Sequence, residues 1–313
     1  MEDSGGSLPK PVAVLACISM TLLYVAILYV PTLVLRLPPP SSYKVLMIRR
    51  FICAAVSSIV SVVFCAFILP TRISKASSLL GVYGIRMDHI WQAVVFPLLL
   101  TSLMYTGSLV LKILLVVKKW KENASQGQGP VFDSIKTILQ EFPCWMLSAA
   151  SSVLFWRTFV VAPLTEELVF RACMIPLLLC GGFNVHSVIF LCPIFFSLAH
   201  FNHTMEICSR YNYILLKASM IIGHQLGYTV VFGSYASFLF IRTGHLVSPL
   251  AAHIFCNYMG LPVIFVQSKG LVTPAFVAGT AAFVLLLFPM TQPDLYNDRT
   301  DNCRCWHGYC SWS

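Results

Sequence analysis

The stretch "VVAPLTEELVFRAC" (residues 160–173) places two adjacent carboxylates, Glu166 and Glu167, and one arginine, Arg171, within an apolar run. The chain around it has 313 residues, of which 58% are hydrophobic and 11% are charged, and its mean hydropathy is +0.79. Soluble domains are about 45–50% apolar and about 25% charged. The composition therefore predicts a polytopic membrane protein, in which charges at membrane depth are costly and indicate a functional site.

Apolar stretches long enough to cross the ~30 Å hydrocarbon layer as helices follow one another along the chain. They lie near residues 12–35, 52–70, 91–117, 142–163, 164–180, 185–201, 213–241, 245–266 and 271–290. Because the fourth and fifth run together and several are short, we expect seven or eight crossings. The sequence thus predicts an all-α fold of about eight transmembrane helices.

The chain divides into three predicted parts by composition. Residues 1–141 form amino-terminal transmembrane helices with basic loops, and they end in an amphipathic segment near 131–141 that suits the membrane surface. Residues 142–290 form a membrane core that carries the polar groups, and residues 291–313 form a polar, Cys-rich tail.

The net charge of +9 is concentrated beside the predicted spans. The basic residues in question are Arg36, Lys44, Arg49 and Arg50 in the first loop and Lys118, Lys119 and Lys121 in the third. Short loops rich in Lys and Arg face the cytosol. These clusters therefore indicate topology and contact with membrane lipid, and they do not indicate nucleic-acid binding.

Helical spacing separates the two acidic residues of the opening stretch. Glu167 and Arg171 are four residues apart, so they share a helix face and can form an ion pair. Glu166 is rotated from Glu167 by about 100° around the helix and points elsewhere. The alternative is that both acids and the arginine form one structural network.

Two further polar islands interrupt the apolar spans. In the first, "FFSLAHFNH" (195–203), His200 and His203 are three residues apart and share a helical face. In the second, "LAAHIFCNYMG" (250–260), His253 and Asn257 are four residues apart and also share a face. Hydrogen bonding between membrane helices is one explanation of such residues.

A catalytic explanation uses the same residues for hydrolysis by an activated water. Glu166 would take the proton from the water and later give it to the leaving amine, while His200 holds that water. His253 and Asn257 would then donate to the tetrahedral oxyanion. No Ser or Cys has a base beside it in a comparable setting, which disfavours a Ser or Cys hydrolase.

Three short motifs, "EELVFR", "FSLAH" and "HIFCN", resemble in order and spacing the EExxxR, FxxxH and HxxxN patterns of the CAAX prenyl endopeptidase family. The resemblance implies an eight-helix protease of the endoplasmic reticulum membrane, with an intramembrane catalytic cavity open to the cytosol. Such enzymes remove the last three residues from farnesylated or geranylgeranylated CAAX proteins such as Ras-type small GTPases. By matching position it implies catalytic roles for Glu166, His200, His253 and Asn257 and supporting roles for Glu167, Arg171 and Phe196, without metal or other cofactor.

Two alternatives remain open at the level of sequence. Glu166, His200 and His253 make a two-His, one-carboxylate set of a kind that zinc uses, so a zinc metalloprotease is the first alternative. The second is a transporter or scaffold without catalytic activity, whose buried charges bind ions or a partner. The sequence does not indicate the oligomeric state.

Overall fold

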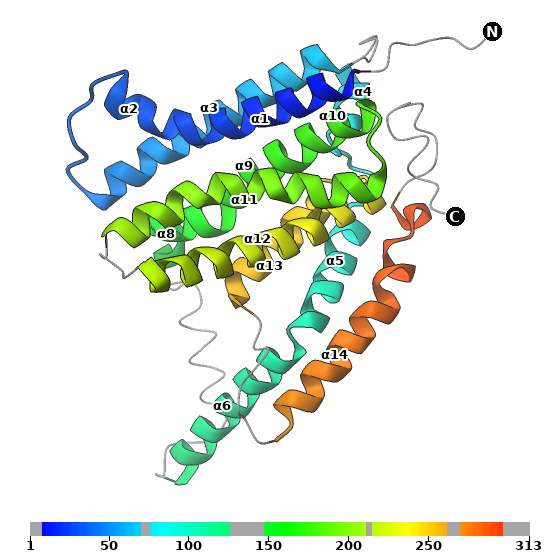
Figure 1. Ribbon diagram of the computed structural model, residues 1–313. Coiled ribbons are helices and arrows are strands. Elements are labelled where there is room, and N and C mark those ends of the chain that lie inside the picture. The colour runs from blue at the N-terminus through cyan, green and yellow to red at the C-terminus, as the bar shows by residue number, and fades with distance from the viewer. Residues whose placement is uncertain (1–7, 70–75, 126–146, 211–214, 262–269, 297–313) are drawn as a thin grey trace.

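The computed structural model describes residues 8–69, 76–125, 147–210, 215–261 and 270–296, and all regular elements in these ranges are helices (Figure 1). The predicted all-α fold is therefore confirmed. The amphipathic segment near 131–141 and most of the Cys-rich tail lie outside the described residues. The division of the chain into three parts stays a prediction.

The first two spans are long helices joined by the proline-rich stretch at residues 37–40. Ser42 begins the second of them by accepting a hydrogen bond at Oγ from the backbone N of Val45 at 3.3 Å, a typical amino-terminal cap. In order, the elements are α1 (Lys10–Ala26), η1 (Ile27–Tyr29), α2 (Val30–Leu33) and α3 (Tyr43–Ile68).

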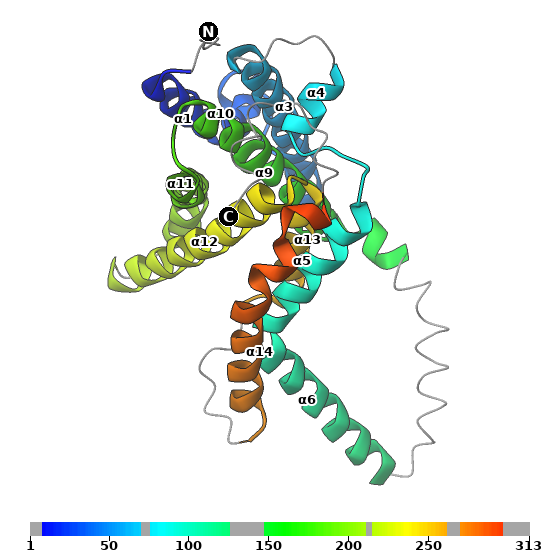
Figure 2. The same cartoon turned by 90° about the vertical axis from the view of Figure 1, so that its right-hand side faces the viewer.

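A bent pair of helices follows the short α4 (Ala76–Val82). The axes of α5 (Ile90–Met104) and α6 (Thr106–Ser125) differ by 75°, and α14 (Val272–Leu287) packs along both (Figures 1 and 2). Thr106 Oγ1 donates to the Ala275 carbonyl at 2.8 Å, and Gly279 gives the backbones room to approach this closely. Small residues serve this purpose between membrane helices.

The polar stretch quoted at the outset lies in one uninterrupted helix, so the two spans predicted at 142–163 and 164–180 are a single helix from Val153 onward. Two π-helical segments widen it, and each precedes a proline, Pro163 or Pro176. A proline ring clashes with the carbonyl four residues earlier, and a widened turn relieves the clash without breaking the helix. The segments of this central helix are α8 (Val153–Trp156), η2 (Arg157–Val161), α9 (Ala162–Glu167), η3 (Leu168–Cys173) and α10 (Met174–Cys180).

Three of the remaining helices pack against the central helix (Figure 1). α11 (Val185–Arg210) and α12 (Leu215–Thr243) pack along each other, and α13 (Val247–Met259) packs against α5, α12 and the central helix. The chain then ends in α14 and two short turns, η4 (Pro289–Thr291) and η5 (Pro293–Leu295). Buried side chains gather around residues 169–179 of the central helix, which is the middle of the core.

The distribution of side chains on α3 fits a lipid environment. Its buried face carries Ser57, Ser61 and Cys65, each 0% exposed, whereas Ile59 is 63% and Phe67 is 84% exposed. Large apolar side chains outside and small ones between helices are typical of membrane proteins, because lipid is as apolar as the residues that face it.

Helix length gives a more limited count of membrane spans. Within the described residues, Lys10–Leu33 and Tyr43–Ile68 are long and apolar enough to cross a membrane, and the bent pair Ile90–Met104 and Thr106–Glu122 is a third if it is one span. The chain is a helical membrane protein, and the number of eight crossings stays a prediction.

Candidate active site

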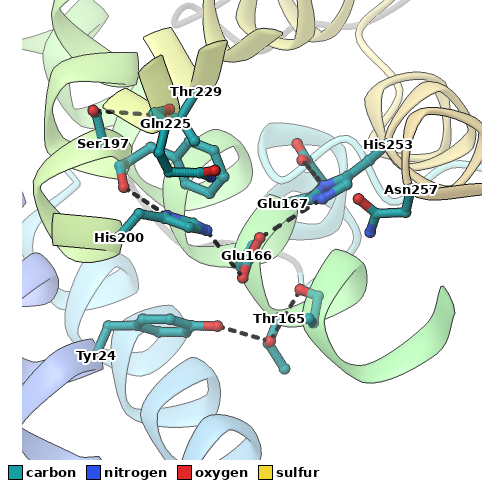
Figure 3. A network of polar contacts seen from close by, with 12 residues as sticks. Tyr24, Thr165, Glu166, Glu167, Ser197, His200, Gln225, Thr229, His253 and Asn257 are labelled. Carbon is teal, nitrogen blue, oxygen red and sulfur yellow. Dashed lines mark hydrogen bonds and ion pairs between the residues drawn. The ribbon is translucent and has the colours of Figure 1, made fainter. Parts of the chain in front are cut away.

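Glu166 lies between two imidazoles that come from different helices (Figure 3). Nε2 of His200 on α11 is 3.9 Å from Oε1 of Glu166, and Nε2 of His253 on α13 is 3.7 Å from Oε2. The side chain of Glu166 is 13% exposed. Polar atoms at such separations are too far apart for a direct hydrogen bond, and a water commonly bridges them.

The second ring nitrogen of His200 fixes which atom faces Glu166. Nδ1 is 3.0 Å from the carbonyl oxygen of Phe196, and the ring centroids of the two residues are 4.4 Å apart. Because a carbonyl only accepts, Nδ1 carries the hydrogen, and in the neutral ring the lone pair of Nε2 is directed toward Glu166. Phe196 therefore orients His200 through both its backbone and its ring.

Glu167 has two partners, although the sequence predicted only one. Its Oε1 accepts from Nη1 of Arg171 at 3.1 Å, as the helical spacing predicts, and from Nδ1 of His253 at 2.7 Å. Glu167 and Arg171 are both 0% exposed. The guanidinium of Arg171 also stacks on the ring of Phe196 at 4.5 Å from its centroid. The ion pair thus holds His253 as well as neutralising a buried charge.

Asn257 connects α13 to the central helix. Its Nδ2 donates to the carbonyl of Thr158 in η2 at 2.8 Å, which fixes the carboxamide and leaves its second N–H available. His253 and Asn257 lie one turn apart and face the same region (Figure 3). The side chain of Asn257 is exposed, so it lies at the rim of the buried cluster.

The π-helical segments offer backbone acceptors to neighbouring helices. In addition to the bond from Asn257 to Thr158, the thiol of Cys192 donates to the Phe170 carbonyl, and that of Cys65 donates to the Cys173 carbonyl. All three acceptors belong to η2 or η3. The widened turns therefore attach the central helix to α13, α11 and α3.

Two residues near Glu166 were missed from the sequence. The hydroxyl of Tyr24 on α1 is 3.1 Å from Oγ1 of Thr165. Since Thr165 donates its own hydrogen to the Val161 carbonyl at 2.8 Å, Tyr24 is the donor in this pair. A tyrosine within the apolar run "TLLYVAILY" was the only signal for this contact.

A cavity of about 200 Å³ adjoins the site between α1, α3, the central helix and α11. Glu166 and His200 line it, together with Tyr24, Thr165 and two arginines, Arg50 and Arg157. His203 follows in α11, but its side chain is outside the described part of the structure.

The described side chains contain no group of three or more His, Cys, Asp or Glu that is arranged to hold a metal ion. Glu166, His200 and His253, the ligand set of the zinc alternative, therefore do not form such a group here.

Comparison with known proteins gives the family. Residues 148–259 match the model of the family described as type II CAAX prenyl endopeptidase Rce1-like. The chain is 59% identical over 313 residues to CAAX prenyl protease 2 of Arabidopsis thaliana, with complete coverage of both chains. The chain belongs to this family. The prediction of a CAAX prenyl endopeptidase, and hence of a hydrolase, is confirmed.

More distant members of the CAAX prenyl endopeptidase family agree. CAAX prenyl protease 2 of Homo sapiens is 37% identical over 297 residues, which are 91% of this chain and 83% of the human one. That of Caenorhabditis elegans is 32% identical over 257 residues, 80% and 86% of the two chains. No solved structure matches the chain. Glu166, His200, His253 and Asn257 all lie within the part that the family model matches.

Proposed function

We propose that this CAAX prenyl endopeptidase removes the carboxy-terminal three residues of farnesylated or geranylgeranylated CAAX proteins by means of a water that Glu166 activates. The observation that carries the mechanism is the position of the Glu166 carboxylate between two imidazole Nε2 atoms, at 3.9 and 3.7 Å. This arrangement joins a general base to a neighbouring hydrogen-bond acceptor and to a second imidazole on a different helix.

The water is oriented by two acceptors. One of its hydrogens points to Oε1 of Glu166 and the other to Nε2 of His200, which acts as an acceptor because Nδ1 carries the hydrogen. The oxygen lone pair of the water then faces the substrate. As Glu166 takes the proton, the water oxygen bonds to the carbonyl carbon of the prenylated cysteine, and the carbonyl electrons move to its oxygen.

The resulting oxyanion needs donors that are already in place. Nδ1–H of His253 donates to Glu167 at 2.7 Å, which fixes the orientation of the ring, and when the ring carries a second proton its Nε2–H donates to the oxyanion. Asn257 supplies its second amide N–H, the first being held by Thr158. When the intermediate collapses, the C–N bond breaks, and Glu166 returns its proton to the leaving amine.

The setting of the reaction is also part of the proposal. We propose that the enzyme lies in the endoplasmic reticulum membrane with its site accessible from the cytosol, and that Ras-type small GTPases are among its substrates. The basic residues expected in the first loop support this orientation, because Lys and Arg are enriched on the cytosolic side; Arg36 lies in that loop, whereas Lys44, Arg49 and Arg50 lie in the first turns of α3, which begins earlier than the sequence predicted. Arg50 and Arg157 line the cavity next to Glu166, on the side of that loop.

The experiment compares the wild-type protein with the variants Glu166→Gln and Glu122→Gln. Each protein is reconstituted in lipid vesicles, and the substrate is a farnesylated CAAX peptide. We expect Glu166→Gln to lower kcat about a thousandfold or more, because it removes the general base. Glu122→Gln makes the same chemical change on the exposed end of α6, where Glu122 is 3.9 Å from Lys118, and should change kcat less than twofold.

The same assay separates the alternatives. Activity that persists in a strong metal chelator supports the proposed mechanism, whereas loss in chelator with rescue by zinc supports the zinc enzyme. If wild-type protein cleaves no prenylated peptide, the protease proposal is refuted in favour of a transporter or scaffold.

A further inference from the structure

Two arginines that the proposed mechanism does not use line the cavity beside Glu166. Arg50 comes from α3 and Arg157 from η2 of the central helix. On α3 the lining residues Met47, Arg50, Phe51 and Ala54 recur at helical spacing, so one face of this helix is turned to the cavity.

The two arginines lie at the same level because α3 and the central helix run in parallel. Early residues of both helices line the cavity together, and further along, Cys65 of α3 donates to the Cys173 carbonyl. Cys65 and Cys173 are 108 positions apart in the chain, and Arg50 and Arg157 are 107 apart. The two arginines therefore line the cavity at one depth from two neighbouring helices.

The distance between the two arginines and Glu166, measured along the central helix, matches the length of three substrate residues. Arg157 precedes Glu166 by nine residues, which corresponds to about 13 Å along a helix at ~1.5 Å per residue. Three extended residues reach about 10 Å, at ~3.3–3.6 Å each. The flexible side chain of an arginine covers the remaining few ångströms.

The chemistry of the leaving peptide matches these walls. Its fixed charge is the terminal carboxylate, which is costly within a membrane protein unless a cation pairs with it. A guanidinium binds a carboxylate through two parallel hydrogen bonds. Between the arginines and Glu166 the walls are mostly apolar, with Val25, Leu28 and Val161, as the aliphatic residues of a CAAX sequence require.

We propose that this cavity holds the three residues that are removed, with their terminal carboxylate bound between Arg50 and Arg157. The inference rests on the proposed function, and it assigns to the two arginines the recognition of a free chain end. Binding at this end places the bond on the carboxyl side of the prenylated cysteine at Glu166, so the enzyme removes three residues because of where the carboxylate is held.

The test compares a farnesylated CAAX peptide that has a free carboxylate with the same peptide bearing a terminal amide. Wild-type enzyme should cleave the carboxylate form with a kcat/KM about ten- to a hundredfold higher, the range expected for hydrogen bonds to a charged group. In Arg157→Gln and Arg50→Gln this preference should shrink, mainly through a higher KM for the carboxylate form, and cleavage of the amide should hardly change.

Arg49→Gln is the matched control. Arg49 is the neighbour of Arg50 on α3, but it donates to the Pro38 carbonyl at 2.7 Å and lies outside the cavity lining. This variant should keep the full preference for the carboxylate.

Each other outcome overturns the inference. If wild-type enzyme cleaves both peptides equally well, or if the preference survives in both cavity variants, the arginines do not bind the chain end. If the variants lose the same factor on both peptides, and the loss depends on the content of anionic lipid in the vesicles, the arginines bind lipid headgroups instead. Failure of wild type to cleave either peptide would instead refute the proposed function.

Discussion

Replacing Arg171 with methionine should destabilise the protein strongly because it leaves a buried carboxylate without its cation. Arg171 and Glu167 are both 0% exposed, and the atoms of the ion pair are 3.1 Å apart. Breaking a buried pair by removing one partner costs about 3–5 kcal/mol. Methionine keeps much of the volume of the side chain, so the effect of a cavity is small.

A second substitution separates charge from packing. In the double variant Arg171→Met/Glu167→Gln no buried charge is left without a partner, and glutamine still offers an oxygen to Nδ1 of His253. The stacking of the guanidinium on Phe196 remains lost, which costs about 1–2 kcal/mol for a desolvated contact. The double variant should therefore recover at least half of the stability that Arg171→Met loses.

Thermal unfolding of the purified protein in detergent, followed by intrinsic tryptophan fluorescence, measures both effects. At roughly 2–4 °C per kcal/mol, Arg171→Met should lower Tm by about 6 °C or more. The argument from buried charge is refuted if the double variant unfolds at the same temperature as Arg171→Met or at a lower one. In that case Arg171 does not stabilise the protein by neutralising Glu167.

Three further outcomes are expected. His200→Ala should lower kcat about 10²- to 10⁴-fold at unchanged Tm, and activity within tenfold of wild type would contradict its role in holding the water. Asn257→Ala should lower kcat about 10²- to 10³-fold with little change in KM, as for loss of an oxyanion donor, and a pure KM effect would contradict this. Gly279→Leu should lower the free energy of unfolding by about 1–3 kcal/mol, because even a Cβ at this position meets the Leu103 carbonyl. Gly223→Leu is the control, since Gly223 lies in open space on α12 and its substitution should leave stability unchanged. Equal melting temperatures of the two variants would refute the close-packing argument.

Local helical spacing explains which parts of the site the sequence could predict. The Glu167–Arg171 pair follows from residues four apart on one helix, and the structure contains it. The bond from Glu167 to His253 joins residues 86 positions apart and depends on how α13 packs on the central helix. No spacing rule within one segment contains that information, so the double role of Glu167 was not predicted.

Hydropathy predicted the membrane class and most helices but misjudged two features. It gave 142–163 and 164–180 as two adjoining stretches, whereas the structure has one helix from Val153 onward, because the widened turns that keep it continuous have no hydropathy signal. It also interpreted Arg50 only as a topological charge, whereas its position on the cavity wall becomes evident only when α3 lies beside the central helix. Both depend on contacts between segments that are far apart in the chain.

The two π-helical segments also bear on how the gene tolerates insertions and deletions. A π-helical turn holds about one residue more than an α-helical turn, so loss of one codon within 157–161 would leave a continuous helix of ordinary geometry. Because the widened turn would close to an ordinary one, the residues before the gap would keep nearly the same rotation about the helix axis relative to Glu166. What would change is the widened turn itself, whose Thr158 carbonyl accepts from Asn257, although each of the three motifs would still be intact when read as letters. A relative that keeps the motifs but carries a single-residue gap here therefore has a differently built site.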